Sequence, residues 1–184
     1  MIKVALLGDS IRLAGYGAKV PALLGEKYEV FQPEDNCRFA KYLLRGLFEW
    51  KSQLEHCDVI HFNCGHWDVC ELFGDGMFSS VEEYKRDMLR VAKILQSYAP
   101  KVIFATTTPV REGYVYNKNE KIRLLNDTVV PEFEKTGIVI NDLHALVSTD
   151  VNRYICAEDL LHLSPEGGEV CAKQVAETIK KLCE

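Results

Sequence analysis

Residues 2–10 read IKVALLGDS, and this stretch decides the fold class. The apolar run from Ile2 to Leu7 is typical of a buried strand, and the turn Gly8-Asp9-Ser10 follows it directly. In open α/β sheets the reactive groups lie at the carboxyl ends of the strands, and this order places Ser10 there. Ser10 is therefore a candidate nucleophile. The alternative is that this serine belongs only to a turn and caps the next helix.

Four further apolar runs predict strands like the first one. They are short and rich in Val, Ile and Phe, as expected of strands that are buried on both faces. These runs are Tyr28 to Phe31, Val59 to Phe62, Val102 to Ala105 and Ile138 to Ile140.

The segments between these runs have apolar residues every three or four positions, which predicts helices. The clearest helix starts at a capping box of Ser80 and Glu83 and has ended before Pro100. The other predicted helices cover 39–54, 122–133 with a kink at Pro131, and a last segment that begins at Ser164 and Pro165. Strand and helix thus alternate, which predicts a mostly parallel sheet with helices on both faces.

The composition indicates a globular protein and excludes two classes of partner. Hydrophobic residues make up 47% of the 184 positions and charged residues 27%, which is ordinary globular usage. We therefore expect residues 1–184 to form a single domain. The formal charge of -5 leaves no basic excess with which to bind nucleic acid or an anionic membrane surface.

The cysteines and the amino-terminal segment predict the compartment. Seven cysteines without a CxxC pair fit neither a complete disulfide framework nor a zinc ribbon, whereas reduced thiols fit the cytosol. The first apolar run is too short for the core of a signal peptide, and no later run approaches the ~20 residues of a membrane span. We therefore expect a cytoplasmic protein.

A carboxylate and an imidazole lie three residues apart in Asp159-Leu160-Leu161-His162, just ahead of the last predicted helix. At this spacing Asp159 can accept a hydrogen bond from one ring nitrogen of His162, and the other nitrogen is then free to take the proton of a serine. A serine hydroxyl is a poor nucleophile without such a base. The alternative is that Asp159 caps a turn and His162 packs beside the helix.

Three motifs together resemble the SGNH or GDSL hydrolase superfamily over nearly the whole chain. Gly8-Asp9-Ser10 is similar to its first block, Thr106-Thr107-Thr108-Pro109 to its fourth and Asp159-Leu160-Leu161-His162 to its fifth. The resemblance implies a flavodoxin-like, three-layer α/β/α fold with a five-stranded parallel sheet. It also implies that Ser10 is the nucleophile, His162 the general base and then acid, and Asp159 its orienting partner, with esters as substrates and no cofactor.

The blocks that form the oxyanion hole in this superfamily are altered here. The superfamily uses the amide of the serine, the amide of a second-block glycine and the Asn of a Gly-x-Asn-Asp third block. Aligned on Gly65 and Asp68, the expected Asn is Trp67, and the second block has no glycine, so an amide donor is expected near Cys37. We expect the side-chain amide of Asn63 to replace the missing Asn, and Trp67 to form a wall of the acyl pocket.

Histidines and cysteines are frequent around the third predicted strand, but they show no recognised spacing of zinc ligands. Alternation along the strand also sends neighbouring side chains to opposite faces. We therefore predict no metal site for this group, which comprises His56, Cys57, His61, Cys64, His66 and Cys70.

The sequence thus predicts a serine esterase that hydrolyses a small or medium acyl ester through an acyl-enzyme on Ser10. An O-acetyl group of a sugar is the ester suggested by the resemblance, and the expected partner is a small-molecule ester. A second class stays open, a non-catalytic or weakly active binding protein of the same fold with a degenerate oxyanion hole. A receiver-type signalling domain is disfavoured because Asn63 stands where a phosphoryl-accepting Asp is needed.

Overall fold

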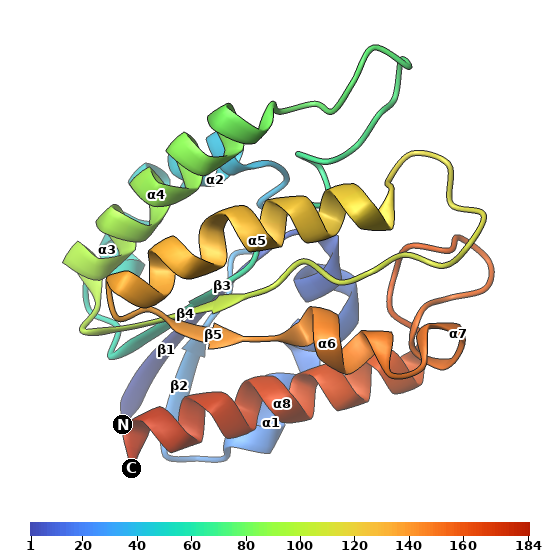
Figure 1. The fold of residues 1–184 in the computed structure, drawn as a ribbon. Helices are drawn as coiled ribbons and strands as arrows, with labels where there is room; N and C mark the ends of the chain where they lie inside the picture. Colours follow the sequence, from blue (N-terminus) through green and yellow to red (C-terminus); the bar gives the residue numbers. More distant parts are fainter.

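A five-stranded parallel sheet forms the centre of the computed structural model, which describes residues 1–184 (Figure 1). The strands lie in the order β2-β1-β3-β4-β5, and every neighbouring pair is parallel. Their bounds are β1 (Ile2–Leu7), β2 (Tyr28–Phe31), β3 (Val59–Phe62), β4 (Lys101–Ala105) and β5 (Val139–Asn141). In this flavodoxin-like order the winding reverses between β1 and β3, which opens a crevice at the carboxyl ends of these two strands. The predicted fold class is confirmed.

Helices cover both faces of the sheet and complete the three layers (Figure 1). One face carries α2 (Ala40–Glu49), α3 (Lys51–Leu54), α4 (Val81–Tyr98) and α5 (Asn119–Lys135). The other carries α1 (Val20–Leu24), α6 (Leu143–Ser148) and α8 (Pro165–Cys183), and the short helix α7 (Val151–Tyr154) precedes α8. A π-helix (Ile11–Tyr16) and a 3-10 turn (Gly17–Lys19) lead from β1 into α1. None of the helices combines the length and the apolar composition that a membrane span requires.

Helices α4 and α8 begin at the side-chain caps that the sequence predicts. Ser80 Oγ accepts from the amide of Glu83, and the Glu83 carboxylate accepts from the amide of Ser80, which starts α4. Ser164 Oγ accepts from the amide of Gly167 at the start of α8. The single helix predicted over 39–54 is instead two helices, because Trp50 leaves the helical conformation with ψ at 10°. Helix α5 runs on through Pro131.

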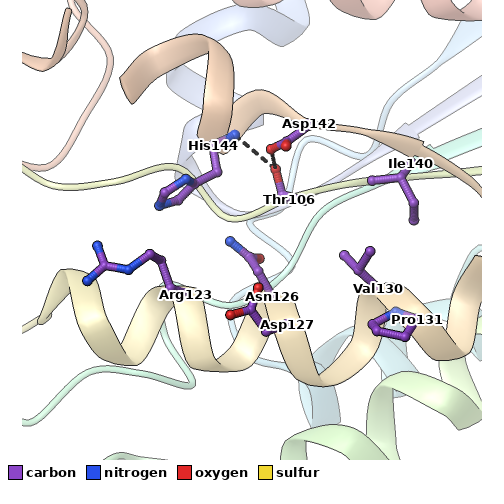
Figure 2. A pocket seen from close by; sticks show the side chains of 9 residues that line it. All are labelled: Thr106, Arg123, Asn126, Asp127, Val130, Pro131, Ile140, Asp142 and His144. Atoms are coloured by element: carbon purple, nitrogen blue, oxygen red, sulfur yellow. Dashed lines mark hydrogen bonds between the residues drawn. The ribbon is translucent and has the colours of Figure 1, made fainter. Parts of the chain in front are cut away.

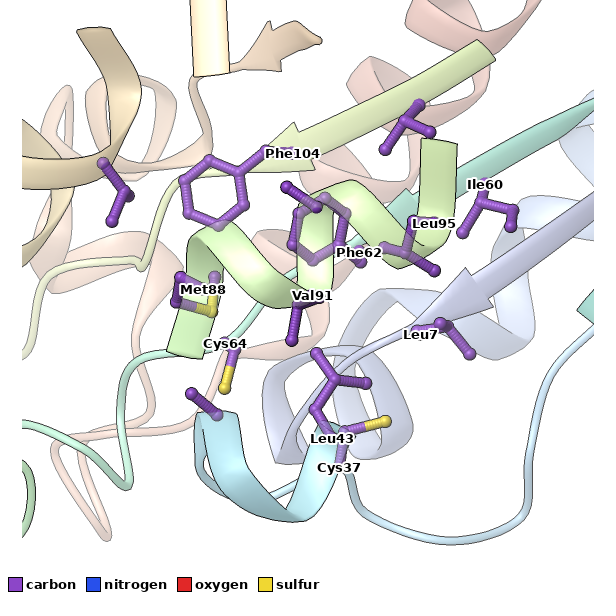
Figure 3. Close-up of a cluster of buried hydrophobic side chains, with 14 of the residues drawn as sticks. Leu7, Cys37, Leu43, Ile60, Phe62, Cys64, Met88, Val91, Leu95 and Phe104 are labelled. Carbon is purple, nitrogen blue, oxygen red and sulfur yellow. The ribbon is translucent and has the colours of Figure 1, made fainter. Parts of the chain in front are cut away.

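An apolar core lies on each side of the sheet, so β3 is buried at every position. On the α4 side, the ring centroids of Phe62 and Phe104 are 5.3 Å apart. Figure 3 shows both rings packed against Met88 and Val91 of α4. Because each such buried side chain contributes about 1.5–3 kcal/mol, the strands and the loops that follow them have a rigid support.

The loops that follow the strands lie together at one end of the sheet (Figure 1). They include residues 8–10 after β1, 32–39 after β2, 63–80 after β3 and 106–118 after β4. The segment 155–164, just before α8, reaches the same end. Residues far apart in sequence therefore meet at the crevice between β1 and β3.

Candidate active site

Ser10, His162 and Asp159 lie in a hydrogen-bonded row at this end of the sheet. Ser10 Oγ is 2.8 Å from His162 Nε2, and His162 Nδ1 is 2.8 Å from Asp159 Oδ2. An ionised carboxylate can only accept, so His162 Nδ1 donates to Asp159, and Nε2 accepts from the Ser10 hydroxyl. The structure thus brings together the three residues proposed as a triad, in the order that general-base activation of a serine requires.

The loop around Asp159 holds this carboxylate in its ionised form. Its Oδ1 accepts from the amides of Leu161 and His162, each at 2.9 Å. Partial burial raises the pKa of Asp159, but these amides and the His162 ring outweigh it, so the pKa lies below its usual value. Leu160 has φ at 62°, a left-handed conformation that costs a non-glycine residue about 1–2 kcal/mol. The backbone is therefore strained where the carboxylate meets the imidazole, as is common at functional sites.

The turn that carries Ser10 is fixed by its two neighbours in the motif. Asp9 is fully buried, and its Oδ1 accepts from the amide of Ile11 at 2.9 Å, which supports the start of the π-helix. A Cβ at position 8 would lie 2.0 Å from Asn63 Oδ1, so only glycine fits there. The Gly8-Asp9-Ser10 turn thus needs its glycine for space and its aspartate for support of the backbone that presents the serine.

A pocket of about 420 Å³ opens beside Ser10 and His162. Its polar lining consists of Ser10, Asn36, His66, Asn117 and His162. Its apolar lining consists of Trp67, Cys70, Leu72, Phe78, Tyr114 and Leu161. No Lys, Arg, Asp or Glu side chain lines the pocket, so it presents a neutral, largely apolar surface to a ligand.

Comparisons with known proteins bear on this arrangement. No protein-family model matches the chain. A curated protein of Arabidopsis thaliana, a GDSL esterase/lipase, is 24% identical over a match that covers 97% of this chain and 79% of that protein. The chain is thus similar over nearly its whole length to a GDSL esterase/lipase, in line with the resemblance to the SGNH or GDSL hydrolases. By its name this relative is an ester hydrolase, which is the class of enzyme that the sequence predicts.

Solved structures share the SGNH fold. The crystal structure of an acetyl xylan esterase has a TM-score of 0.80 at 20% identity, with 97% of this chain and 100% of that chain covered. The structure of the lipase/acylhydrolase from Enterococcus faecalis has a TM-score of 0.78 at 19% identity, with 98% and 96% covered. The fold of the chain is thus that of these proteins over its whole length.

The segment expected to match the second block differs from the prediction. The Cys37 amide donates to the Gly8 carbonyl at 3.0 Å, and the Gly8 amide donates to Cys37 Sγ at 3.2 Å. The expectation that the Cys37 amide serves the oxyanion hole is therefore corrected, because this N–H already has a partner within the protein. Burial also raises the pKa of the Cys37 thiol to about 11, so the side chain stays neutral.

Asn63 and Trp67 have different surroundings. They are the two candidates for the oxyanion-hole donor that the third block supplies in the SGNH superfamily. Asn63 is 3% exposed beside Gly8, and its Oδ1 accepts from the Tyr16 hydroxyl at 3.0 Å. Tyr16 is fully buried, and desolvation holds its pKa well above the usual value, so it remains a donor and Asn63 Nδ2 is the atom left free to donate. Trp67 is 41% exposed and lies in the wall of the pocket.

His66 and Asn117 form a polar wall of the pocket that sequence reasoning missed. His66 Nδ1 accepts from Asn117 Nδ2 at 3.1 Å, so Nε2 carries the proton and donates to Thr108 Oγ1 at 3.0 Å. Burial lowers the pKa of His66 to about 4, so the ring is neutral at pH 7. The sequence contains one indication of this wall. Thr108 lies in the motif that is similar to the fourth SGNH block, and its hydroxyl is the hydrogen-bond partner of His66.

The histidines and cysteines around β3 have separate environments. His61 is fully buried, and its Nε2 accepts from Asn141 Nδ2 at 3.1 Å. Cys57 and Cys64 belong to the core on the α4 side, whereas His56 lies near Glu55 at the surface. No three His, Cys, Asp or Glu side chains are grouped so that they could hold a metal ion.

A second hollow, of about 460 Å³, lies between α5 and α6 and contains none of the three triad residues. Figure 2 shows Arg123, Asn126 and Asp127 of α5 facing Asp142 and His144 across it. Two of its polar side chains have protein partners: Asn126 binds both backbone polar groups of Thr107, and Asp142 accepts from the Thr106 hydroxyl. The candidate active site is therefore the smaller pocket, beside Ser10.

Proposed function

We propose that this chain is a serine esterase that hydrolyses a small or medium acyl ester through an acyl-enzyme on Ser10. The observation that carries the proposal is the row Ser10, His162 and Asp159, with 2.8 Å between Oγ and Nε2 and 2.8 Å between Nδ1 and Oδ2. These distances allow direct proton transfer from the hydroxyl to the imidazole. Asp159 orients the ring and stabilises its protonated form.

The reaction then has two halves that use the same histidine. In the first, His162 Nε2 takes the Ser10 proton while Oγ bonds to the ester carbonyl carbon, and the bond to the alcohol oxygen breaks as His162 protonates that oxygen. In the second, His162 takes a proton from water while the water oxygen attacks the acyl carbon. The bond to Oγ breaks, Ser10 regains the proton, and the carboxylic acid leaves.

The negative charge on the carbonyl oxygen needs donors, and we propose Asn63 Nδ2 as one of them. Its place beside Gly8, with Oδ1 held by Tyr16, supports this role. A preorganised donor of this kind typically contributes about 100 to 1000-fold in rate, because it strengthens as charge develops in the transition state.

The pocket supports an uncharged substrate, and we propose an O-acetylated sugar. The acyl group in that case is small, and Trp67 is placed to limit the space beside Ser10. No Lys, Arg, Asp or Glu side chain lines the pocket to neutralise an anionic or cationic substrate, so burial of such a group would be costly. A solved relative in fold is an acetyl xylan esterase. The cytoplasmic location expected from the sequence stays a prediction.

A non-catalytic binding protein of the same fold is the second candidate. The observation in its favour is that the Cys37 amide, at the expected second-block position, is occupied by the Gly8 carbonyl. A protein that lacked stabilisation of the oxyanion would bind an ester in the pocket without turning it over.

Hydrolysis of acetylated sugars and of chromogenic esters with rising acyl length separates the two functions. For an esterase, the wild-type protein releases acetate or the chromophore, and Ser10→Ala, which removes only the hydroxyl, abolishes this release. For a binding protein, the wild-type protein and Ser10→Ala are equally inactive but bind the ester. Release of product by Ser10→Ala at the wild-type rate would contradict the proposed mechanism.

A further inference from the structure

Asn36 lies in the wall of the reactive pocket together with Ser10 and His162. It belongs to the loop 32–39 between β2 and α2, where the SGNH second block is expected and where the glycine is missing. Three consecutive backbone amides of this loop are already used: the Asn36 amide donates to Asp35 Oδ1, the Cys37 amide to the Gly8 carbonyl and the Arg38 amide to Asn36 Oδ1. An oxyanion donor from residues 36–38 therefore has to be a side chain.

The oxygen and the nitrogen of the Asn36 side-chain amide have different surroundings. Oδ1 accepts from the backbone amide of Arg38 at 2.8 Å, which fixes the orientation of the whole group. The one hydrogen bond of this side chain within the protein is through Oδ1, so Nδ2 has no acceptor there, and the residue lines the pocket. With the oxygen held by Arg38, Nδ2 is the end that is free to donate to a bound ligand.

The loop that carries Asn36 is held firmly against the turn of Ser10. Arg12, which is 2% exposed, donates to the carbonyl oxygens of Pro33 at 2.9 Å, Asp35 at 2.7 Å and Gly8 at 3.3 Å. The paired bonds between Gly8 and Cys37 fasten the same two segments. A donor on this loop is thus preorganised relative to Ser10, as transition-state stabilisation requires.

We propose that Asn36 is a catalytic residue whose Nδ2 donates to the oxyanion and replaces the missing second-block glycine amide. This inference rests on the proposed esterase function. When Ser10 Oγ adds to the ester carbonyl, the carbonyl oxygen gains the electron pair of the broken π bond, and Asn36 Nδ2 donates a hydrogen bond to it. No proton is transferred, and the bond weakens again when the carbonyl re-forms.

The test compares Asn36→Asp with Asn36→Ala in steady-state ester hydrolysis. Asn36→Asp keeps an oxygen for the Arg38 amide but exchanges the donor for a negative charge, whereas Asn36→Ala removes both ends. A catalytic donor predicts that Asn36→Ala lowers kcat about 100-fold with little change in KM, and that Asn36→Asp lowers it further. A purely structural role predicts the opposite order, because Asn36→Asp preserves the loop. Asn152→Asp, on the exposed surface of α7, makes the same change of charge outside the pocket and is expected to leave kcat within about 2-fold of wild type.

A second readout is the affinity of an alkyl boronic acid that forms a tetrahedral adduct with a serine. The proposal predicts that its dissociation constant rises in Asn36→Ala by about the factor lost in kcat/KM. Unchanged boronate affinity, or a kcat of Asn36→Asp equal to or above that of Asn36→Ala, would overturn the role of Asn36 in an active enzyme. If Asn36→Asp does not fold, the boronate affinity of Asn36→Ala decides alone. An inactive wild-type protein would overturn the proposed function, and the role of Asn36 with it.

Discussion

The hydroxyl oxygen of Ser10 lies 2.8 Å from Nε2 of His162, although 152 positions separate the two residues in the sequence. They meet because the start of α8 packs very closely on the segments around it. A Cβ at Gly167 would lie 2.0 Å from the Tyr154 carbonyl oxygen, and one at Gly168 would lie 3.1 Å from the Gly15 carbonyl oxygen. Gly167 lets α8 approach the end of α7, and Gly168 lets it approach the π-helix after Ser10, which together set the loop of His162 above the serine.

The first prediction is that the residues of the triad act as one unit. Ser10→Ala and His162→Ala are each expected to lower kcat at least ~1000-fold, because the hydroxyl and its base are used in the same proton transfer. The double variant is expected to be no slower than either single variant. Rates for the three variants check this, and losses that multiply in the double variant would show that the residues act independently.

The second prediction concerns Asn63. Asn63→Ala is expected to lower kcat about 100-fold with little change in KM, because a donor to the oxyanion acts mainly in the transition state. Tyr84→Phe is the matched control for a lost buried hydrogen bond: its hydroxyl binds the Cys64 carbonyl from the other face of the sheet, so kcat is expected to change little. An unchanged kcat in Asn63→Ala would remove Asn63 from the oxyanion hole.

The third prediction concerns Trp67, which lines the pocket and is 41% exposed. Trp67→Ala removes a large apolar wall and is expected to shift the preference toward longer acyl chains, mainly through KM. Trp67→Phe keeps most of the bulk without the indole N–H and is expected to retain the wild-type kcat. A strong loss of kcat in Trp67→Phe, with Asn63→Ala unaffected, would assign the oxyanion donor to Trp67 instead.

The fourth prediction is a loss of stability in acid that involves His61. Burial lowers the pKa of His61 to about 3, below that of an unfolded histidine near 6.5, so the unfolded chain takes up the proton first. Stability therefore falls as the pH drops below about 6.5. Between pH 7.5 and pH 5 this histidine should cost about 2 kcal/mol of unfolding free energy.

His61→Gln isolates this contribution, because other buried groups titrate in the same range. His66 acts in the same direction, whereas burial raises the pKa of Asp68 to about 6, so protonation of Asp68 stabilises the folded state over part of this range. Urea unfolding at the two pH values is expected to show a loss about 2 kcal/mol smaller in His61→Gln than in the wild-type protein. Equal losses would show that the titration of His61 does not control this dependence.

Most of the sheet and the starts of helices α4 and α8 could be predicted from the sequence for physical reasons. A strand buried on both faces has to be a run of apolar residues, so β3 appears at Val59–Phe62 as expected. Helix α4 has a capping box that fixes its start. The break at Trp50 and the short helices α6 and α7 were missed, because one or two turns are too short to show a helical period.

Some residues of the candidate site could likewise be predicted from the sequence, and others could not. Ser10, Asp159 and His162 lie in sequence motifs, and the structure brings them together. Asn36 and Asn117 lie in irregular loops, where no period or spacing indicates which residue faces a pocket. The position near Cys37 was misjudged because its amide meets Gly8 only after β1 and the loop beyond β2 have packed together.

The measurement that tests the central claim most directly is covalent labelling with a fluorophosphonate, followed by mass spectrometry of the labelled peptide. A serine activated by His162 attacks such a reagent, whereas an ordinary surface serine does not. The account predicts one label per chain, on Ser10, and its loss in both Ser10→Ala and His162→Ala. Stoichiometric labelling of Ser10→Ala, or the absence of any label on a folded wild-type protein, would contradict the account.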